Sequence, residues 1–219
     1  MRVSHVALDD FRSYRHAVVE FAPGTTVLLG SNGQGKTNLV EAVSYLSAFS
    51  SHRVSAEQAL VRLPLSPDEA QPGGAVVRVR LVTAGERETV IELEIVRGKA
   101  NRAKVNRTQV RPREVLGLLK SVVFSPEDLQ IVRGDPQVRR QFLDDLLIQQ
   151  HPLIAQVKSD FDKVARQRAA LMKSAQSQLR RGFTPDFSTV EVWDDTFAQL
   201  SAQLSLARVG LVDELRGPA

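Results

Sequence analysis

Apolar residues in the first half of the chain either alternate with polar ones or form short runs rich in β-branched side chains. This spacing predicts strands, here over residues 2–8, 17–21, 76–82, 89–96, 102–106 and 108–110. Two further runs, Thr25–Leu29 and Lys120–Phe124, are apolar enough to predict buried strands. Short links such as Ala84–Glu86 predict hairpins, so most of these strands should form an antiparallel meander.

The spacing of apolar residues becomes helical near residue 126. Asp135 followed by Pro136 predicts a helix start, because Asp is a favoured N-cap and Pro fits the first helical position. Two later stretches place side chains at alternating steps of three and four residues, which predicts an antiparallel helical hairpin with a narrow seam, joined by a loop over residues 182–188. The seam positions are Val157, Phe161, Val164, Arg168, Leu171 and Ala175 on one arm, and Trp193, Phe197, Leu200, Leu204, Ala207 and Leu211 on the other.

These two kinds of spacing predict an α/β fold with two lobes, one over residues 1–125 and a helical one over residues 126–219. The chain has 219 residues, 42% of them hydrophobic, which is enough for a packed core. The absence of cysteine excludes disulfides and thiolate metal sites. No apolar run is long enough to span a membrane and no signal peptide is evident, so a cytoplasmic protein is predicted.

One motif carries specific chemistry. The residues Gly30, Ser31, Asn32, Gly33, Gln34, Gly35, Lys36 and Thr37 fit G-x-x-x-x-G-K-[ST], the phosphate-binding loop of P-loop NTPases. Glycines let backbone N–H groups approach phosphate oxygens, and a helix predicted over residues 38–49 adds a positive N-terminus. Lys36 can reach the β- and γ-phosphates, and the Thr37 hydroxyl can bind Mg²⁺. The motif therefore predicts binding of a nucleotide and Mg²⁺.

Basic residues concentrate between Arg97 and Arg113, where seven Lys or Arg occur without an acid. Two interpretations remain open. The strip can be a solvated sheet face, which is the more common case for a run of charge. Alternatively it can bind DNA phosphates, with Arg102, Lys104 and Arg107 as the candidate contacts. The net charge of +4 permits an anionic partner without requiring one.

An NTPase also needs an acid at the end of a buried strand to hold Mg²⁺ and orient water. The available acids fit poorly: Pro126 interrupts the strand before Glu127 and Asp128, and Asp144 and Asp145 lie in the helical half. No N-K-x-D motif is present, which disfavours a GTPase. No catalytic residue is therefore assigned, and the chain is expected to be the first part of an NTPase.

Several stretches together resemble the RecF family of bacterial DNA replication and repair proteins, over the whole chain. Beyond the phosphate-binding loop and the Asn38–Ala42 segment after it, these are Asp10–Tyr14, Ser51–Arg53, Phe124–Leu129, Arg139–Asp144 and Val192–Asp194. The loop alone is general to the wider ABC-type class that includes Rad50 and SMC heads. The stretches F-S-P-E-D-L and R-R-x-F-L-D are more specific to the RecF family.

The resemblance implies an ABC-type ATPase lobe followed by a helical lobe, with Arg12 and Asn38 joining the loop at the ATP site. It also implies binding to double-stranded and gapped DNA, and an ATP-dependent homodimer. Partners implied in the same way are RecR, with RecO and RecA in one pathway, and a role in RecA loading and the SOS response.

The chain departs from the family pattern in two ways. Neither a signature loop of the L-S-G-G-Q kind nor an acidic Walker B strand occurs by Ala219. The fold is therefore expected to be incomplete at the C-terminus, with weak ATP binding and negligible turnover. Two alternatives remain: a module that binds DNA or a protein partner without nucleotide turnover, and, less favoured, a P-loop small-molecule kinase.

Overall fold

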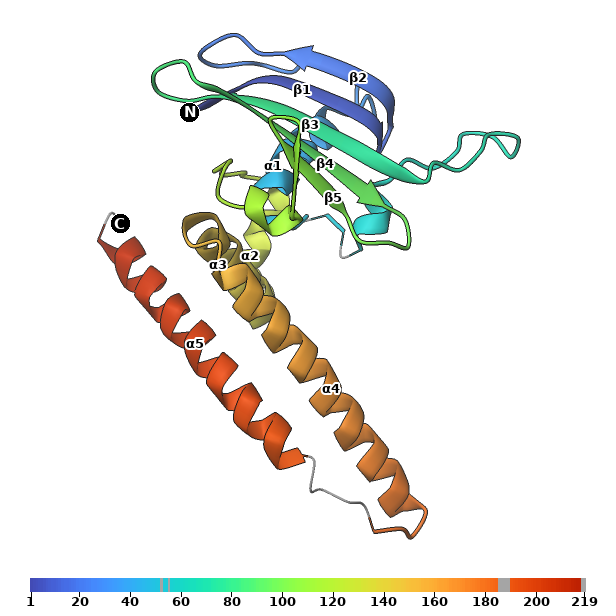
Figure 1. Ribbon diagram of the computed structural model, residues 1–219, viewed down its shortest axis with the longest axis vertical. Coiled ribbons are helices and arrows are strands. Elements are labelled where there is room, and N and C mark those ends of the chain that lie inside the picture. The colour runs from blue at the N-terminus through green and yellow to red at the C-terminus, as the bar shows by residue number, and fades with distance from the viewer. Residues whose placement is uncertain (52, 55, 185–189, 218–219) are drawn as a thin grey trace. The chain divides into compact units, whose positions relative to one another are not determined.

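The computed structural model describes residues 1–51, 53–54, 56–184 and 190–217, with the side chains of residues 127 and 191 outside the description. The chain forms two compact units, Met1–Arg133 and Gly134–Ala219 (Figure 1). The sequence predicted a boundary after residue 125, whereas the first unit of the structure extends to Arg133. Within the described parts of the chain, no helix has the length and apolar character needed to cross a membrane.

The first unit is built on a six-stranded antiparallel sheet. Its strands run in the order β2 (Tyr14–Glu20), β1 (Arg2–Phe11), β3 (Gly74–Val82), β4 (Glu88–Val96), β5 (Arg102–Val105) and β6 (Thr108–Val110). All neighbouring pairs are antiparallel, which confirms the predicted meander.

One face of this sheet packs against helix α1 (Lys36–Ala48). Every second residue of the central strands is buried, as the period of a strand requires. The main contributors to this core are Val6, Leu8, Phe11, Val77, Val79, Leu81, Ile91, Leu93 and Ile95 from the strands, with Leu39, Ala42, Tyr45 and Leu46 from α1. A Val, Leu, Ile or Phe side chain of this core stabilises the fold by about 1.5–3 kcal/mol when fully buried, so the sheet fixes the position of α1.

Short helices complete this unit. They are η1 (Glu57–Leu60), η2 (Pro112–Val115), η3 (Pro126–Leu129) and α2 (Gln130–Arg133). Leu60 and Val61 are buried in the same core, and Val61 forms an isolated bridge with Phe11 at the end of β1. This bridge holds the end of η1 beside the β1–β2 turn.

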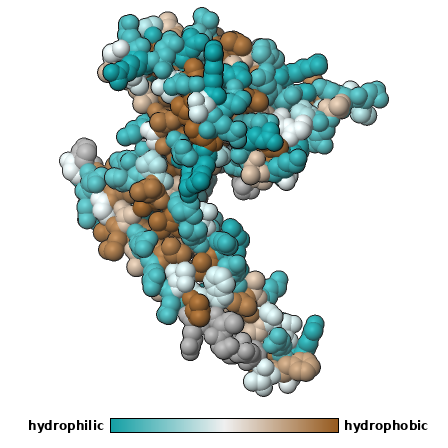
Figure 2. All heavy atoms as spheres, in the orientation of Figure 1, coloured by the Kyte–Doolittle hydropathy of each residue, from teal (hydrophilic) through white to brown (hydrophobic). Residues whose placement is uncertain are grey.

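Two predicted strands are absent. Neither Thr25–Leu29 nor Lys120–Phe124 forms a strand, and Leu29 and Phe124 are 88% and 87% exposed. A strand needs a hydrogen-bonding neighbour as well as an apolar sequence, and none of the described strands pairs with either run. The prediction of buried strands at these two places was therefore wrong. Hydrophobic residues reach the surface of each unit in Figure 2.

The second unit contains the helices α3 (Pro136–Gln150), α4 (Ile154–Arg180) and α5 (Val190–Arg216). Asp135 is the N-cap of α3, as predicted. Helices α4 and α5 pack along their lengths, and the Phe161 and Phe197 rings stack with centroids 5.3 Å apart. The seam therefore contains its aromatic residues as predicted. The predicted connecting loop lies partly outside the described residues, at 185–188.

Candidate functional site

The glycine loop precedes α1 and is exposed over residues 30–34. Gly33 and Gly35 have φ angles of 84° and 92°, in the left-handed region where glycine is favoured. Gly35 is constrained a second time, because a Cβ there would lie 2.9 Å from both Ser13 Oγ and Tyr14 Oη. The backbone curl that the motif predicts is thus present, and it requires glycine at these positions.

Helix α1 begins at Lys36 with no side chain capping its N-terminus and no acid in its first turn. The Leu39 N–H donates to the Gly35 carbonyl at 3.0 Å, so the N–H groups of Lys36, Thr37 and Asn38 have no acceptor within the helix. A helix N-terminus with free donors and a positive dipole end favours an anion. The predicted helix is confirmed here, and its start has the character of a phosphate site.

The Lys36 side chain curls back over the loop. Its Nζ donates to the backbone carbonyls of Gly30 at 2.6 Å and Ser31 at 2.8 Å. These acceptors are neutral, and an ammonium group forms stronger hydrogen bonds with an anion. Lys36 is therefore held at the loop and can exchange these carbonyls for phosphate oxygens. Thr37 follows on the exposed side of the helix, with its hydroxyl available to a cation.

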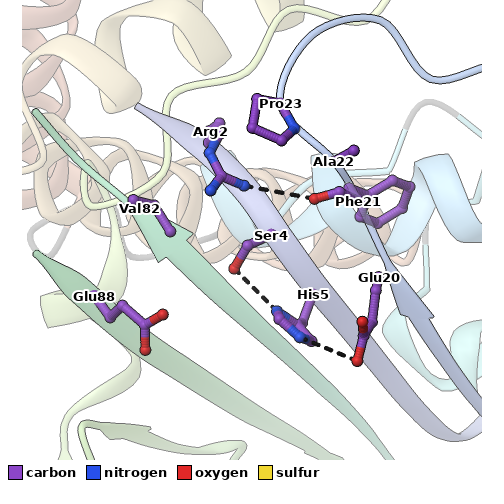
Figure 3. A pocket seen from close by; sticks show the side chains of 9 residues that line it. All are labelled: Arg2, Ser4, His5, Glu20, Phe21, Ala22, Pro23, Val82 and Glu88. Carbon is purple, nitrogen blue, oxygen red and sulfur yellow. Dashed lines mark hydrogen bonds and ion pairs between the residues drawn. The ribbon is translucent and has the colours of Figure 1, made fainter. Parts of the chain in front are cut away.

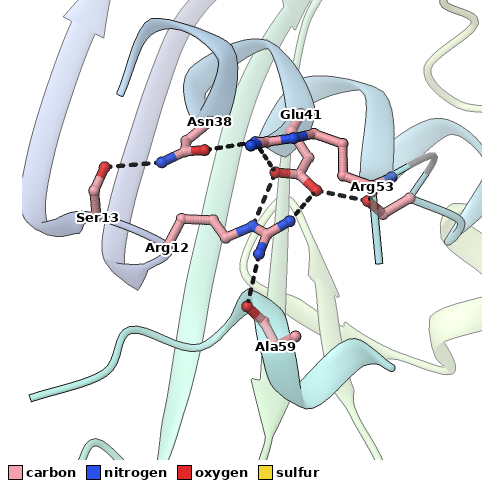
Figure 4. Close-up of polar contacts among 7 residues, drawn as sticks. Arg12, Ser13, Asn38, Glu41, Arg53 and Ala59 are labelled. Atoms are coloured by element: carbon pink, nitrogen blue, oxygen red, sulfur yellow. Dashed lines mark hydrogen bonds and ion pairs between the residues drawn. The ribbon is translucent and has the colours of Figure 1, made fainter. Parts of the chain in front are cut away.

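A buried carboxylate lies on α1 next to the loop (Figure 4). Glu41 is 1% exposed and accepts two hydrogen bonds from Arg12, 2.9 Å from Nε and 2.7 Å from Nη2. Ser51 Oγ donates to Glu41 at 2.6 Å, and Arg53 Nη1 at 3.1 Å. We call these four residues the Glu41 cluster. It ties the β1–β2 turn and the segment after α1 to the helix that follows the loop.

The charge of Glu41 is stabilised by its partners. Burial alone favours the neutral acid, but the hydrogen bonds from Arg12 and Ser51 and the charges of Arg12 and Arg53 outweigh it and hold the pKa of Glu41 below its usual value. The cluster therefore contains two guanidinium groups and one carboxylate. It leaves net positive charge beside the glycine loop.

Two of the predicted ATP-site residues bind protein groups. Asn38 donates to Ser13 Oγ at 2.9 Å and accepts from Arg53 Nη1 at 2.8 Å. Arg12 Nη1 donates to the Ala59 carbonyl at 3.0 Å, so each of its three guanidinium nitrogens donates to a protein group. Their side chains brace the helix start in this structure, while the Asn38 backbone N–H stays at the anion-favouring end.

Sequence reasoning did not assign a role to Glu41, Ser51 or Arg53. All three occur in stretches that carried the family resemblance, and that was the available signal. Arg53 is the more exposed of the two arginines, at 34% against 16% for Arg12. His52, in the same stretch, lies outside the described residues.

The basic strip is paired with acids on the outer face of the sheet. Lys104 lies 2.8 Å from Glu92, and Arg102 lies 3.6 Å from Glu94 on the neighbouring strand. The hydrogen bond from Lys104, with that from Arg78 and their charges, outweighs partial burial and lowers the pKa of Glu92. Arg107 is exposed in the β5–β6 turn, at φ 71°. This pairing favours the solvated-face interpretation for Arg102 and Lys104.

Two of the acids considered for Mg²⁺, Asp128 and Asp144, have other partners, and the side chain of Glu127 lies outside the description. Asp128 accepts from the Ser125 backbone N–H at 2.6 Å. Asp144 is buried in the helical unit and accepts from Arg208 Nε at 2.8 Å and Nη2 at 2.9 Å. Within the described residues, no group of three or more His, Asp or Glu side chains could hold a metal. The acids that the structure describes therefore add no catalytic group to the site.

A separate hollow of about 440 Å³ lies at the other end of β1 (Figure 3). His5 contacts Ser4 Oγ at 3.0 Å through Nδ1 and Glu20 at 3.3 Å through Nε2. Arg2 and the acids Glu20 and Glu88 share this hollow, so its charge is mixed. It lacks the free backbone donors of the α1 N-terminus, and the glycine loop remains the candidate site.

Comparisons with known proteins agree with this geometry. The model of the RecF/RecN/SMC N terminal domain family matches residues 2–209. The DNA replication and repair protein RecF of Frankia alni is 49% identical, over 99% of this chain and 55% of the relative. That of Beutenbergia cavernae is 51% identical, over 99% and 53%. The chain spans about half the length of the curated relatives it matches.

Solved structures are similar as well. The recombination mediator protein RecF-ATP in the RecFOR pathway matches with a TM-score of 0.82 and 27% identity, over 98% of this chain and 55% of that one. A structure of SMC ATPases, described for ATP-driven dimerization and DNA stimulated activation, matches with a TM-score of 0.54 and 22% identity, over 66% of this chain and 98% of that one. The second likeness shows the fold alone.

Proposed function

This chain belongs to the RecF/RecN/SMC N terminal domain family, and from that premise we propose that it binds ATP at residues 30–38 within a DNA replication and repair protein of the RecF kind. The observation that carries the proposal is the start of α1. It is uncapped, free of acids, and preceded by a glycine loop with Lys36 folded over it. The RecF relative described with ATP supports the same ligand.

The residues present fit a triphosphate. The N–H groups of Lys36, Thr37 and Asn38 supply donors, and Lys36 supplies charge. The Thr37 hydroxyl would bind the accompanying Mg²⁺, whose charge offsets that of the phosphates. Arg12 acts through Glu41 and Ala59 and holds the β1–β2 turn against the site.

The proposal extends to the whole protein through its relatives. ATP binding would close a homodimer on duplex or gapped DNA in the cytoplasm, and hydrolysis would release it. RecR, RecO and RecA are the proposed partners, with assistance to RecA loading and the SOS response as the outcome. Support comes from the names of the relatives, RecF and the RecFOR pathway.

Calorimetric titration with Mg²⁺-ATP tests the ATP site. The 219-residue chain should bind weakly, with negligible turnover. Lys36→Ala should lower affinity at least tenfold, because it removes a charged hydrogen bond. Lys99→Ala, in the exposed β4–β5 link, is the matched control and should bind like wild type. Equal affinity of wild type and Lys36→Ala, or hydrolysis abolished by Lys36→Ala, would contradict this account.

The second candidate is a DNA-binding module without nucleotide turnover. The exposed Arg107 in the β5–β6 turn favours it. Duplex-DNA affinity, measured with and without ATP at several salt concentrations, separates the two functions. If the affinity ignores ATP and Lys36→Ala but falls for the double variant Arg102→Ala and Lys104→Ala, the module is the better description. The slope of log affinity against log salt should then decrease by about 0.9 for each lost phosphate contact.

A further inference from the structure

Two hydroxyl groups, that of Ser13 in the β1–β2 turn and that of Tyr14 at the start of β2, converge on the last glycine of the loop. A Cβ built on Gly35 would lie 2.9 Å from Ser13 Oγ, and also 2.9 Å from Cζ and Oη of Tyr14. Gly35 is buried, although the rest of the loop before it is exposed. The turn therefore covers Gly35, at the point where α1 begins.

The hydrogens of these two hydroxyls have no acceptor in the described parts of the chain. Ser13 Oγ accepts a hydrogen bond from Asn38 at 2.9 Å, which leaves its own O–H to be donated. No described group takes the O–H of Tyr14 either. Ser13 is exposed, and Tyr14 is half-buried with its Oη not among the fully buried atoms that lack a partner, so a ligand can reach both hydroxyls.

The surroundings of these hydroxyls are rich in donors. The free N–H groups of the first turn of α1 and the Lys36 ammonium lie on the residues that follow Gly35. A ligand that satisfies all of these groups must offer many acceptor oxygens and few donors. Phosphate has this property, whereas ribose hydroxyls and an adenine edge offer both kinds of group.

We propose that the hydroxyls of Ser13 and Tyr14 donate hydrogen bonds to phosphate oxygens of the bound nucleotide, so that the β1–β2 turn forms a second wall of the phosphate site. This inference rests on the proposed ATP function. It adds two ligand-contacting residues outside the loop motif. It also gives a reason for glycine at position 35, because any side chain there would displace both donors.

The test uses Tyr14→Phe and Ser13→Ala in the full chain, titrated with ATP and with inorganic tripolyphosphate. Each variant removes one hydrogen bond to a charged group, so each should weaken both ligands about tenfold. Tyr14→Phe keeps the ring against Gly35, so its thermal unfolding should match wild type. Tyr45→Phe is the matched control, because Tyr45 is the only other tyrosine and donates its hydroxyl to Glu57. It should lower stability and leave affinity unchanged.

The outcomes separate this inference from the proposed function. If wild type binds neither ligand, or Lys36→Ala binds equally well, the ATP site itself is overturned. If wild type binds through Lys36 while Tyr14→Phe and Ser13→Ala bind like wild type, only this inference is overturned. If Tyr14→Phe weakens ATP but not tripolyphosphate, the hydroxyl contacts the sugar or base, and the phosphate assignment is wrong.

Discussion

In the described part of each unit one buried carboxylate is bound by an arginine, and the two sites differ in what surrounds them. Among the described residues, Glu41 in α1 and Asp144 in α3 are the buried acids. Each accepts two hydrogen bonds from one guanidinium, of Arg12 or of Arg208. By burial and geometry alone the two sites would be judged equivalent.

Their neighbourhoods separate them. The cations around Asp144, Arg208 of α5 and Lys158 of α4, come from the helices that it joins. Glu41 instead contacts Arg53, which also bonds to Asn38 in the first turn of α1, where N–H donors are free. A buried ion pair is therefore weak evidence for function, since structural networks form them too. Unused donors next to the pair are the stronger sign of a ligand.

The largest expected effect is on stability, when the Asp144–Arg208 ion pair of the helical unit is removed. Asp144→Ala leaves the half-buried Arg208 without its counter-charge, so the helical unit should lose about 3 kcal/mol of unfolding free energy. Urea unfolding followed by circular dichroism measures it. Asp145→Ala, at the next position on α3, is the control and should change stability far less. Affinity for ATP should be unaffected; a tenfold change in it would show that Asp144 serves the nucleotide site.

Glu41→Gln should reduce stability less than Asp144→Ala does, and it should also change the affinity for ATP. The amide preserves shape but leaves two guanidiniums without a counter-charge, which should cost about 2 kcal/mol. The added positive charge beside the loop should raise ATP affinity about threefold at low salt, and less at high salt because ions screen it. Isothermal titration at two salt concentrations measures this. If affinity is the same as wild type at low salt, Glu41 is as purely structural as Asp144.

The smallest expected effect is a pH dependence. The pKa of Glu41 is lowered in the folded protein, so its contribution to stability is complete above the unfolded value, near 4.5, and is lost as pH falls through the folded value. The stability difference between wild type and Glu41→Gln should therefore shrink below about pH 4.5. Urea unfolding from pH 3 to 7 tests it. A difference that stays constant with pH, or grows in acid, would contradict the charged state assigned to Glu41.

Local patterns predicted much of the fold and of the site. The alternation in β3 and β4, the heptad spacing in α4 and α5, and the glycine loop each involve residues close in sequence, so the sequence itself contains the signal. The Thr25–Leu29 run failed because strand pairing depends on a neighbour that the run does not specify. The pairing of Arg12 with Glu41, across 29 positions, follows from how β1 packs on α1, and no local spacing encodes it.

The contact of Tyr14 with Gly35 also joins residues far apart in sequence, so local patterns do not predict it. The motif explains glycine by backbone conformation, whereas the structure adds a steric reason that comes from another strand. For Arg102 and Lys104, counting charges within one segment missed the acids of β4, which lie directly across the ladder. The acids across the ladder therefore determine that Arg102 and Lys104 are neutralised.

Amide hydrogen exchange with and without saturating Mg²⁺-ATP tests the central claim most directly. The claim is that nucleotide binds at the start of α1 and is coupled to the Glu41 cluster but not to Asp144. Protection should increase over residues 33–38, at the β1–β2 turn and at Arg53, with no change around Asp144 and Arg208. Lys36→Ala should abolish the increase. No protection at the loop, or equal protection in both units, would contradict the account.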